Sequence, residues 1–288
     1  MAGAAGTGRT PVESGGSAVS SPAVRIVGAA AGVATGAVLG AISAVRRAKA
    51  VHPHGESYLA ELTVRGIATA PPGARLLRTA GAHRAIVRFS RSLGLPPALP
   101  DLLGMSIRVL DAYGSDRHQD FLLVSSADLP IVHHVFLPAA DVQQRPYTSS
   151  LPYRSGGTRF IIGVLPDARS PRPQGGDEFD RLRAAAATGD LRFTLAVASI
   201  MGRFRPIADI SIGAPLPATV DALRFNPWNS GAGLEPAGVL NAMRRYAYPM
   251  SQWAWRQARR GGARLQDTAE RVAEAARASR VSVPTRHR

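Results

Sequence analysis

The sequence contains no cysteine, which excludes disulfide bonds, thiolate catalysis and metal ligation by thiolates. Aromatic residues are scarce, at 6% of the chain, and the sequence has neither a zinc-ligand spacing nor an aromatic-rich RNA-binding motif. Acidic residues are also few, because 20 Asp and Glu accompany 35 Lys and Arg, for a formal net charge of +15. That charge suggests nucleic acid or an anionic membrane as a partner, and the missing modules lead us to expect no nucleic acid.

Large apolar side chains are nearly absent from residues 1–22, which consist mainly of Gly, Ala, Ser and Thr. Such a segment cannot bury a core, so we predict that it is disordered. The whole chain of 288 residues has an ordinary hydrophobic content of 45%, which suffices for one main folded domain.

Charge is missing from the twenty residues 26–45, which are followed by a basic cluster that ends at Lys49. Twenty helical residues can span a bilayer, and a glycine at every fourth position would form a close-packing ridge. We therefore predict a membrane or signal-anchor helix over residues 23–47, with membrane contact through 26–45. A cleaved export signal and a flexible surface segment are the alternatives, because Ala and Gly dominate this composition. The basic cluster after the segment predicts a membrane-associated protein that is otherwise cytoplasmic.

The stretch from Phe225 to Pro249 combines a loop and a helix. Prolines and glycines punctuate its first half, and a helix is predicted from Val239 to Arg260 with a kink at Pro249. Arg244 and Tyr248 are four residues apart, which puts the guanidinium beside the phenol on one helix face. A positive charge favours the phenolate, and a phenolate is an oxygen ligand able to hold ferric iron. The same pair also occurs on ordinary surface helices.

This stretch resembles the proximal haem segment of the catalase family, whose pattern runs FDP, GIEP and RxxxYPD. The resemblance implies that Tyr248 ligates the iron of haem b, in the ferric state, with Arg244 beside it. Met250 departs from the pattern, because the family has aspartate there. The matching residues are Phe225, Asn226, Pro227, Gly233, Leu234, Glu235, Pro236, Arg244, Tyr248 and Pro249.

Two earlier segments resemble the distal side of the same site. The segment KAVHPHG (49–55) is similar to RVVHAKG, which implies that His52 is the distal acid–base group and that Lys49 replaces a propionate-binding arginine. The segment IVRFS (86–90) has a strand-like alternation and is similar to the family's VRFS. The resemblance implies that Arg88 binds a haem propionate and that Ser90 orients His52. It also places Arg256 near a further propionate arginine.

One segment departs from the family at a position that bears on activity. QDFLLVSS (119–126) stands where catalases have WDLVGNN, so the asparagine that helps to position peroxide is missing. Ser125 or Ser126 occupies its neighbourhood. We therefore hypothesise weak disproportionation of hydrogen peroxide and better peroxidase activity.

Other segments indicate fold more than chemistry. DLLGMSIRV (101–109) predicts a strand, and FDRLRAAAATGDLRFTLAVAS (179–199) predicts a helix that ends near Gly189 and then a strand. Both resemble catalase segments. In IVHHVF we expect a strand whose adjacent histidines, His133 and His134, point to opposite faces and serve packing or the surface.

Together these segments predict an α+β fold, an antiparallel β-barrel with flanking helices, preceded by a candidate membrane helix. The predicted regions are a disordered N-terminus (1–22), a membrane or anchor helix (23–47), a haem-binding domain (48–260) and a basic tail (261–288). The implied function is a haem peroxidase that reduces hydrogen peroxide or organic and lipid hydroperoxides with an unknown reductant. A lipid-hydroperoxide isomerase or dehydratase and a non-enzymatic haem-binding membrane protein are the alternatives, and assembly as a homo-oligomer stays open.

Overall fold

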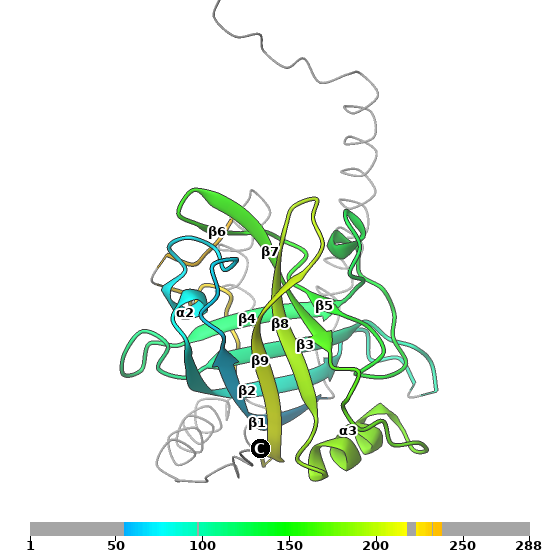
Figure 1. Cartoon of the computed structure of the whole chain (residues 1–288). Coiled ribbons are helices and arrows are strands. Elements are labelled where there is room, and N and C mark those ends of the chain that lie inside the picture. Colours follow the sequence, from blue (N-terminus) through cyan, green and yellow to red (C-terminus); the bar gives the residue numbers. More distant parts are fainter. Residues whose placement is uncertain (1–54, 97, 218–222, 232, 238–288) are drawn as a thin grey trace, which may run out of the picture. The chain divides into compact units, whose positions relative to one another are not determined.

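The computed structural model describes residues 55–96, 98–217, 223–231 and 233–237, all within the compact unit Ala48–Arg288. These residues form a closed antiparallel β-barrel, seen from the side in Figure 1. Its eight strands are β1 (Gly55–Val64), β2 (Gly81–Arg91), β3 (Leu103–Val109), β4 (Gln119–Ser125), β5 (Tyr147–Thr148), β7 (Thr158–Pro166), β8 (Arg192–Ser199) and β9 (Arg205–Pro215).

The strands follow the order β7-β5-β4-β3-β2-β1-β9-β8, and pairing of β8 with β7 closes the ring. Two further short strands extend the sheet beyond β7: β6 (Tyr153–Ser155) pairs with β7, and β10 (Glu235–Pro236) pairs with β6. The predicted antiparallel barrel is thus confirmed. Closure gives each of the eight strands a partner on both sides, over only two residues at β5, which limits pairing of the sheet with other chains.

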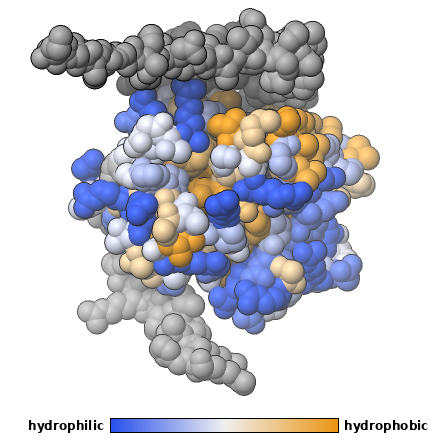
Figure 2. Space-filling view, turned by 45° about the horizontal axis from the view of Figure 1, so that its top comes forward, coloured by the Kyte–Doolittle hydropathy of each residue, from blue (hydrophilic) through white to orange (hydrophobic). Residues whose placement is uncertain are grey.

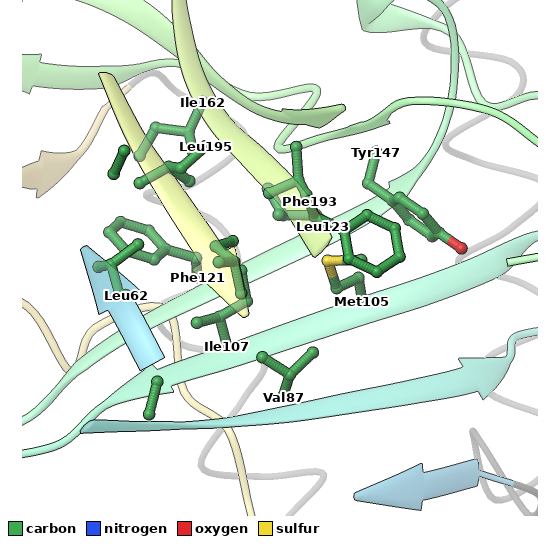
Figure 3. Close-up of a cluster of buried hydrophobic side chains, with 14 of the residues drawn as sticks. Leu62, Val87, Met105, Ile107, Phe121, Leu123, Tyr147, Ile162, Phe193 and Leu195 are labelled. Carbon is green, nitrogen blue, oxygen red and sulfur yellow. The ribbon is translucent and has the colours of Figure 1, made fainter. Parts of the chain in front are cut away.

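Alternation of side chains along the strands separates the barrel interior from its outer surface. On β2, Val87 and Phe89 belong to the central apolar cluster, whereas Ile86 belongs to a second cluster outside the barrel. Figure 3 shows the interior, where side chains from non-neighbouring strands, such as Leu62 of β1 and Phe121 of β4, belong to one buried cluster. The interior is therefore a packed core that fixes which residues each strand presents outward.

In the part of the chain that the structure describes, three short helical segments accompany the barrel: α2 (Arg75–Arg78), the 3₁₀ turn η1 (Val132–His134) and α3 (Glu178–Ala187). Asp177 caps the N-terminus of helix α3, and its carboxylate accepts the backbone N–H groups of Phe179 and Asp180 at 2.8 Å. The helix ends before Gly189, whose φ of 76° is the left-handed conformation expected after a helix C-terminus. The predicted helix and its end are confirmed.

The segment IVHHVF is not the strand that its apolar composition predicts. Ile131 has a φ of 69°, which turns the chain sharply, and residues 132–134 then wind into the 3₁₀ turn η1. His133 and His134 consequently lie side by side, with ring centroids 4.4 Å apart, instead of on opposite faces.

Among the described residues, none of the helices has the length and apolar character needed to cross a bilayer. The candidate membrane segment, residues 26–45, lies outside the described residues.

Candidate functional site

The outer face of β1, β2 and β3 carries three cross-strand rows of side chains. Their register is Gly55–Ser90–Gly104, Ser57–Arg88–Ser106 and Leu59–Ile86–Arg108. The first two rows contain only glycine and serine, apart from one arginine. These two rows therefore form a flat part of the outer face, on which Arg88 is the one large side chain and the one charge.

Arg88 is half-buried, and its guanidinium reaches across to the start of β1. A Cβ atom added to Gly55 would come within 2.6 Å of Arg88 Nη2 and of the carbonyl oxygen of Phe89. Glycine at residue 55 thus gives the guanidinium its space. The charge lies beside Gly55, the first described residue of the barrel.

Ser90 is directly opposite Gly55 and is 4% exposed. His52 precedes Gly55 by three residues, a length of chain that spans at most roughly 10 Å. The length of chain therefore permits the contact between Ser90 and His52 that the resemblance implies.

The face suits a flat, anionic ligand such as haem. A planar macrocycle needs side chains that do not project, which Gly55, Ser57, Ser90 and Gly104 provide. Its propionates need a cation, which Arg88 provides. The described residues thus fit the group that the sequence resemblance implies.

A buried ion pair holds the 223–231 segment against the same side of the barrel. Arg108 Nε and Nη2 donate to the two carboxylate oxygens of Asp120 at 2.8 and 2.7 Å, and Asp120 is fully buried. Asp120 also accepts the backbone N–H of Asn226 at 2.8 Å, and Arg108 donates to the carbonyl of Arg224 at 2.6 Å. The guanidinium of Arg108 lies over the ring of Phe225, 5.3 Å from its centroid. The first residues of the predicted proximal stretch are therefore fixed beside the Arg88 row.

The rest of that stretch is anchored as far as residue 237. Ser230 Oγ donates to Gln119 Oε1 at 3.1 Å, and Leu234 is fully buried. Gly233 has a φ of 80° and its Cα faces the carbonyl oxygen of Gly73 so closely that no side chain would fit. A glycine is thus required where the stretch passes over the loop before α2.

Neither Ser125, the last residue of β4, nor Ser126 after it takes the place of the missing asparagine. Ser125 Oγ donates to the Leu137 carbonyl at 2.6 Å, and Ser126 Oγ donates to the Val135 carbonyl at 2.6 Å. Both serines are fully buried. Because Val124 pairs with Gly104, Val124 is the β4 residue in the row of Ser90, and the position carries no hydrogen-bond donor.

Five of the predicted site residues, Lys49, His52, Arg244, Tyr248 and Arg256, lie outside the described residues. Their roles stay predictions. Of the seven residues predicted, the structure describes Arg88 and Ser90, and it brings these two together on one face.

The sequence does not reveal how His133 and His134 are used. His133 Nε2 lies 3.0 Å from the carbonyl oxygen of Ile200, and His134 Nε2 lies 3.1 Å from the same oxygen. His134 Nδ1 lies 2.8 Å from the carbonyl oxygen of Ser150. The two imidazoles therefore connect η1 to the turn between β8 and β9 and to the loop after β5.

We expect His133 to make the protein less stable in weak acid. Burial, and next the neighbouring His134, lower the pKa of the His133 imidazole below its usual 6.5, while the Ile200 carbonyl and Asp128 oppose that shift. The unfolded chain thus binds a proton below about pH 6.5 that the native state does not, so stability falls as the pH falls. Urea unfolding between pH 7.5 and 5.5 should show that the free energy of unfolding falls less steeply with falling pH in His133→Leu than in wild type. The two slopes should differ by less than about 1.4 kcal/mol per pH unit, the most that one titrating group can contribute. Equal pH slopes for the two proteins would contradict this role.

The described residues contain one cluster of potential metal ligands, in the turn between β3 and β4. Ligand atoms of Asp111, Asp116 and His118 lie within 4.8 Å of one another. Asp111 Oδ1 accepts the backbone N–H of Asp116 at 2.9 Å, and His118 Nδ1 accepts that of Asp111 at 3.1 Å. These bonds explain the cluster as a stabilised turn, and we assign no metal to it.

No protein-family model matches the chain, and no curated protein matches its sequence. Among solved structures, the chain is similar to a bacterial catalase (12% identity, TM-score 0.49), a fungal catalase (13%, 0.50) and catalase A from Saccharomyces cerevisiae (11%, 0.46). These matches cover 66%, 71% and 69% of this chain and 53%, 60% and 60% of the catalases, respectively. The chain therefore spans less than two thirds of their length. At such identities the likeness to the fungal catalase establishes a catalase-like fold.

Proposed function

We propose that this chain is a haem-dependent peroxidase that reduces hydrogen peroxide or an organic hydroperoxide at the expense of an external reductant. One observation carries the proposal: the flat part of the outer face that carries Arg88 lies beside the anchored start of the predicted proximal stretch. The catalase-like fold is consistent with this assignment.

The proposed roles fall into two groups: residues that would hold the haem and residues that would transfer the proton of the peroxide. Bound haem would supply the iron at which the oxygen–oxygen bond of a peroxide is cleaved. Arg88 would pair with a propionate, and Tyr248 as phenolate, beside Arg244, would ligate the iron. Ser90 would hold one nitrogen of His52, so that the other nitrogen takes a proton from the peroxide and returns it to the leaving oxygen.

The test is the absorption spectrum of the full chain produced with haem. We expect a ferric haem spectrum that is lost or altered in Tyr248→Phe, and weaker haem retention in Arg88→Gln. Arg84→Gln is the matched control, because Arg84 lies on the same strand but is exposed. A folded wild-type protein that binds no haem would overturn the proposal, whereas consumption of a lipid hydroperoxide without a reductant would favour the isomerase alternative.

The wild-type protein should oxidise a reductant with peroxide more readily than it releases oxygen from hydrogen peroxide. The β4 position in the row of Ser90 is Val124, which cannot donate a hydrogen bond to a second peroxide. A positioned donor contributes on the order of a hundredfold in rate, so oxygen release by the wild type should be weak by about that factor. We expect Val124→Asn to raise oxygen release, measured with an oxygen electrode, relative to oxidation of a dye.

Ser125→Asn is the control for that substitution, because residue 125 follows residue 124 and its side chain points to the opposite face of β4. It should not raise oxygen release. Rapid oxygen release by the wild type, or an equal gain from both variants, would refute the assignment of Val124.

A further inference from the structure

Two loops of the barrel expose large apolar side chains close to each other. The connection after β4 exposes Leu129, Ile131 and Val135, and the turn between β8 and β9 exposes Met201, which at 60% is the most exposed large apolar residue described. Figure 2 shows hydrophobic residues gathered on one part of the surface, with hydrophilic residues around them. Apolar side chains gathered in this way commonly mark an interaction surface.

The two loops are fixed to each other, so their exposed side chains form one surface. Asp128 Oδ1 accepts the backbone N–H of Phe204 at 3.0 Å. His133 and His134 both meet the carbonyl oxygen of Ile200, and the ring of His133 lies 5.6 Å from that of Phe204. Hydrogen bonds between the two loops thus fix the positions of their exposed apolar side chains.

The charge around these side chains is almost entirely positive. Arg203 and Arg205 are exposed on the β8–β9 turn, and Arg159 is exposed on β7, where its neighbour Phe160 pairs with Ser199. The segments 126–138 and 199–206 contain one acidic residue, Asp128, whose carboxylate is already bonded to the Phe204 N–H. A partner for this surface should therefore be apolar at its centre and anionic around it.

An anionic lipid bilayer has this chemistry. Apolar side chains enter the boundary between headgroups and acyl chains, while arginines remain among the anionic headgroups. A second copy of this chain fits less well, because an isologous contact would bring Arg203 and Arg205 against the same residues of the other copy.

We propose that this loop-tip surface, made of Leu129, Ile131, Val135, Met201, Arg159, Arg203 and Arg205, docks the barrel on an anionic membrane. The proposal needs neither residues 26–45 nor bound haem. It adds a membrane contact that belongs to the folded domain itself.

The absence of cysteine makes the contact directly testable in the full chain. Met201→Cys, labelled with an environment-sensitive fluorophore, should show a blue-shifted and brighter emission with phosphatidylcholine vesicles that contain phosphatidylglycerol. Asp190→Cys is the control position, because residue 190 precedes β8 and residue 201 follows it, so the eight residues of the strand separate them by roughly 26 Å. The label at residue 190 should not respond.

The arginines are tested by Arg203→Gln/Arg205→Gln in the Met201→Cys background, which should weaken vesicle binding by about tenfold or more. An unchanged label at residue 201 while the protein sediments with vesicles would mean that another part of the chain binds, and would overturn the proposal. An equal response to vesicles of phosphatidylcholine alone would refute the charge argument. A response without vesicles that grows with protein concentration would assign the surface to self-association instead. None of these readouts depends on haem or on peroxidase activity.

Discussion

Replacing Asp120 by alanine is expected to lower the free energy of unfolding by about 3–5 kcal/mol, because Arg108 would remain buried without its partner. Both carboxylate oxygens of Asp120 accept from Arg108, and one of them also accepts the N–H of Asn226. The substitution therefore also releases the segment that begins the proximal stretch. Urea unfolding followed by circular dichroism measures the loss, and haem retention should fall with it.

The matched control is Asp209→Ala, which breaks an exposed ion pair with Arg65 and should change stability by less than about 1 kcal/mol. A second comparison replaces both partners, as Arg108→Leu/Asp120→Leu, and should recover much of the stability because no charge is left buried. If Asp120→Ala costs no more than Asp209→Ala, the buried pair does not anchor the segment.

Replacing Arg91 by methionine should produce a loss of similar size, about 3–5 kcal/mol. Arg91 forms ion pairs with two buried carboxylates, those of Glu178 and Asp101, and donates to the carbonyls of Pro96 and Leu99. Removing the guanidinium leaves two negative charges in an interior that cannot solvate them. Thermal unfolding should show a melting temperature lower by about 10 °C.

Adding Glu178→Gln to Arg91→Met should restore part of that loss, because one of the two unpaired charges is removed. Arg183→Met is the control on the same helix: Arg183 pairs with Glu56 and Asp180 at the surface and should cost less than about 1 kcal/mol. Equal costs for the Arg91 and Arg183 variants would show that burial does not set the energy of these pairs.

Strands such as β2 were predictable because they alternate apolar and polar residues over a short run, whereas β5, with only two residues, carries no such pattern. In IVRFS the period of two separates Val87 and Phe89 from Arg88 and Ser90, and the structure places the first pair in the core. The same period correctly groups Arg88 and Ser90 on one face. Local pattern was enough here, because side-chain direction in a strand is a local property.

Closure of the barrel and the shape of the 126–138 connection were not predictable in the same way. Alternation indicates a strand without naming its neighbour, so the pairing of β7 with β8 could be inferred only through the family resemblance. The turn at Ile131 is not marked by a glycine in the sequence, although the φ of Ile131 is positive. The apolar run around His133 and His134 suggests a strand. Tertiary bonds to Ile200 decide the local conformation instead.

The parts of the site that the sequence did not reveal depend on register between strands. Arg108 and Asp120 are 12 residues apart, and their pairing follows from the alignment of β3 with β4. The only signal in the sequence is that each places a charge in an otherwise apolar strand. Val124 was missed for a related reason: a shift of one residue along β4 exchanges the two faces, so Ser125 seemed as good a candidate.

The pairing of β1 with β9 has a consequence for the order in which the molecule forms. The two strands are joined by pairs such as Val64 with Ala208, which are 144 residues apart in the chain, and the ion pair of Arg65 with Asp209 extends the contact just beyond β1. Contacts of such long sequence separation carry a large loop-closure entropy and are associated with slow folding, in milliseconds to seconds or longer. On a ribosome the ring cannot close before β9 has been synthesised, and the 223–237 segment emerges later still. Until then the first strands expose their unpaired edges, so the nascent chain should depend on chaperones more than its modest size suggests.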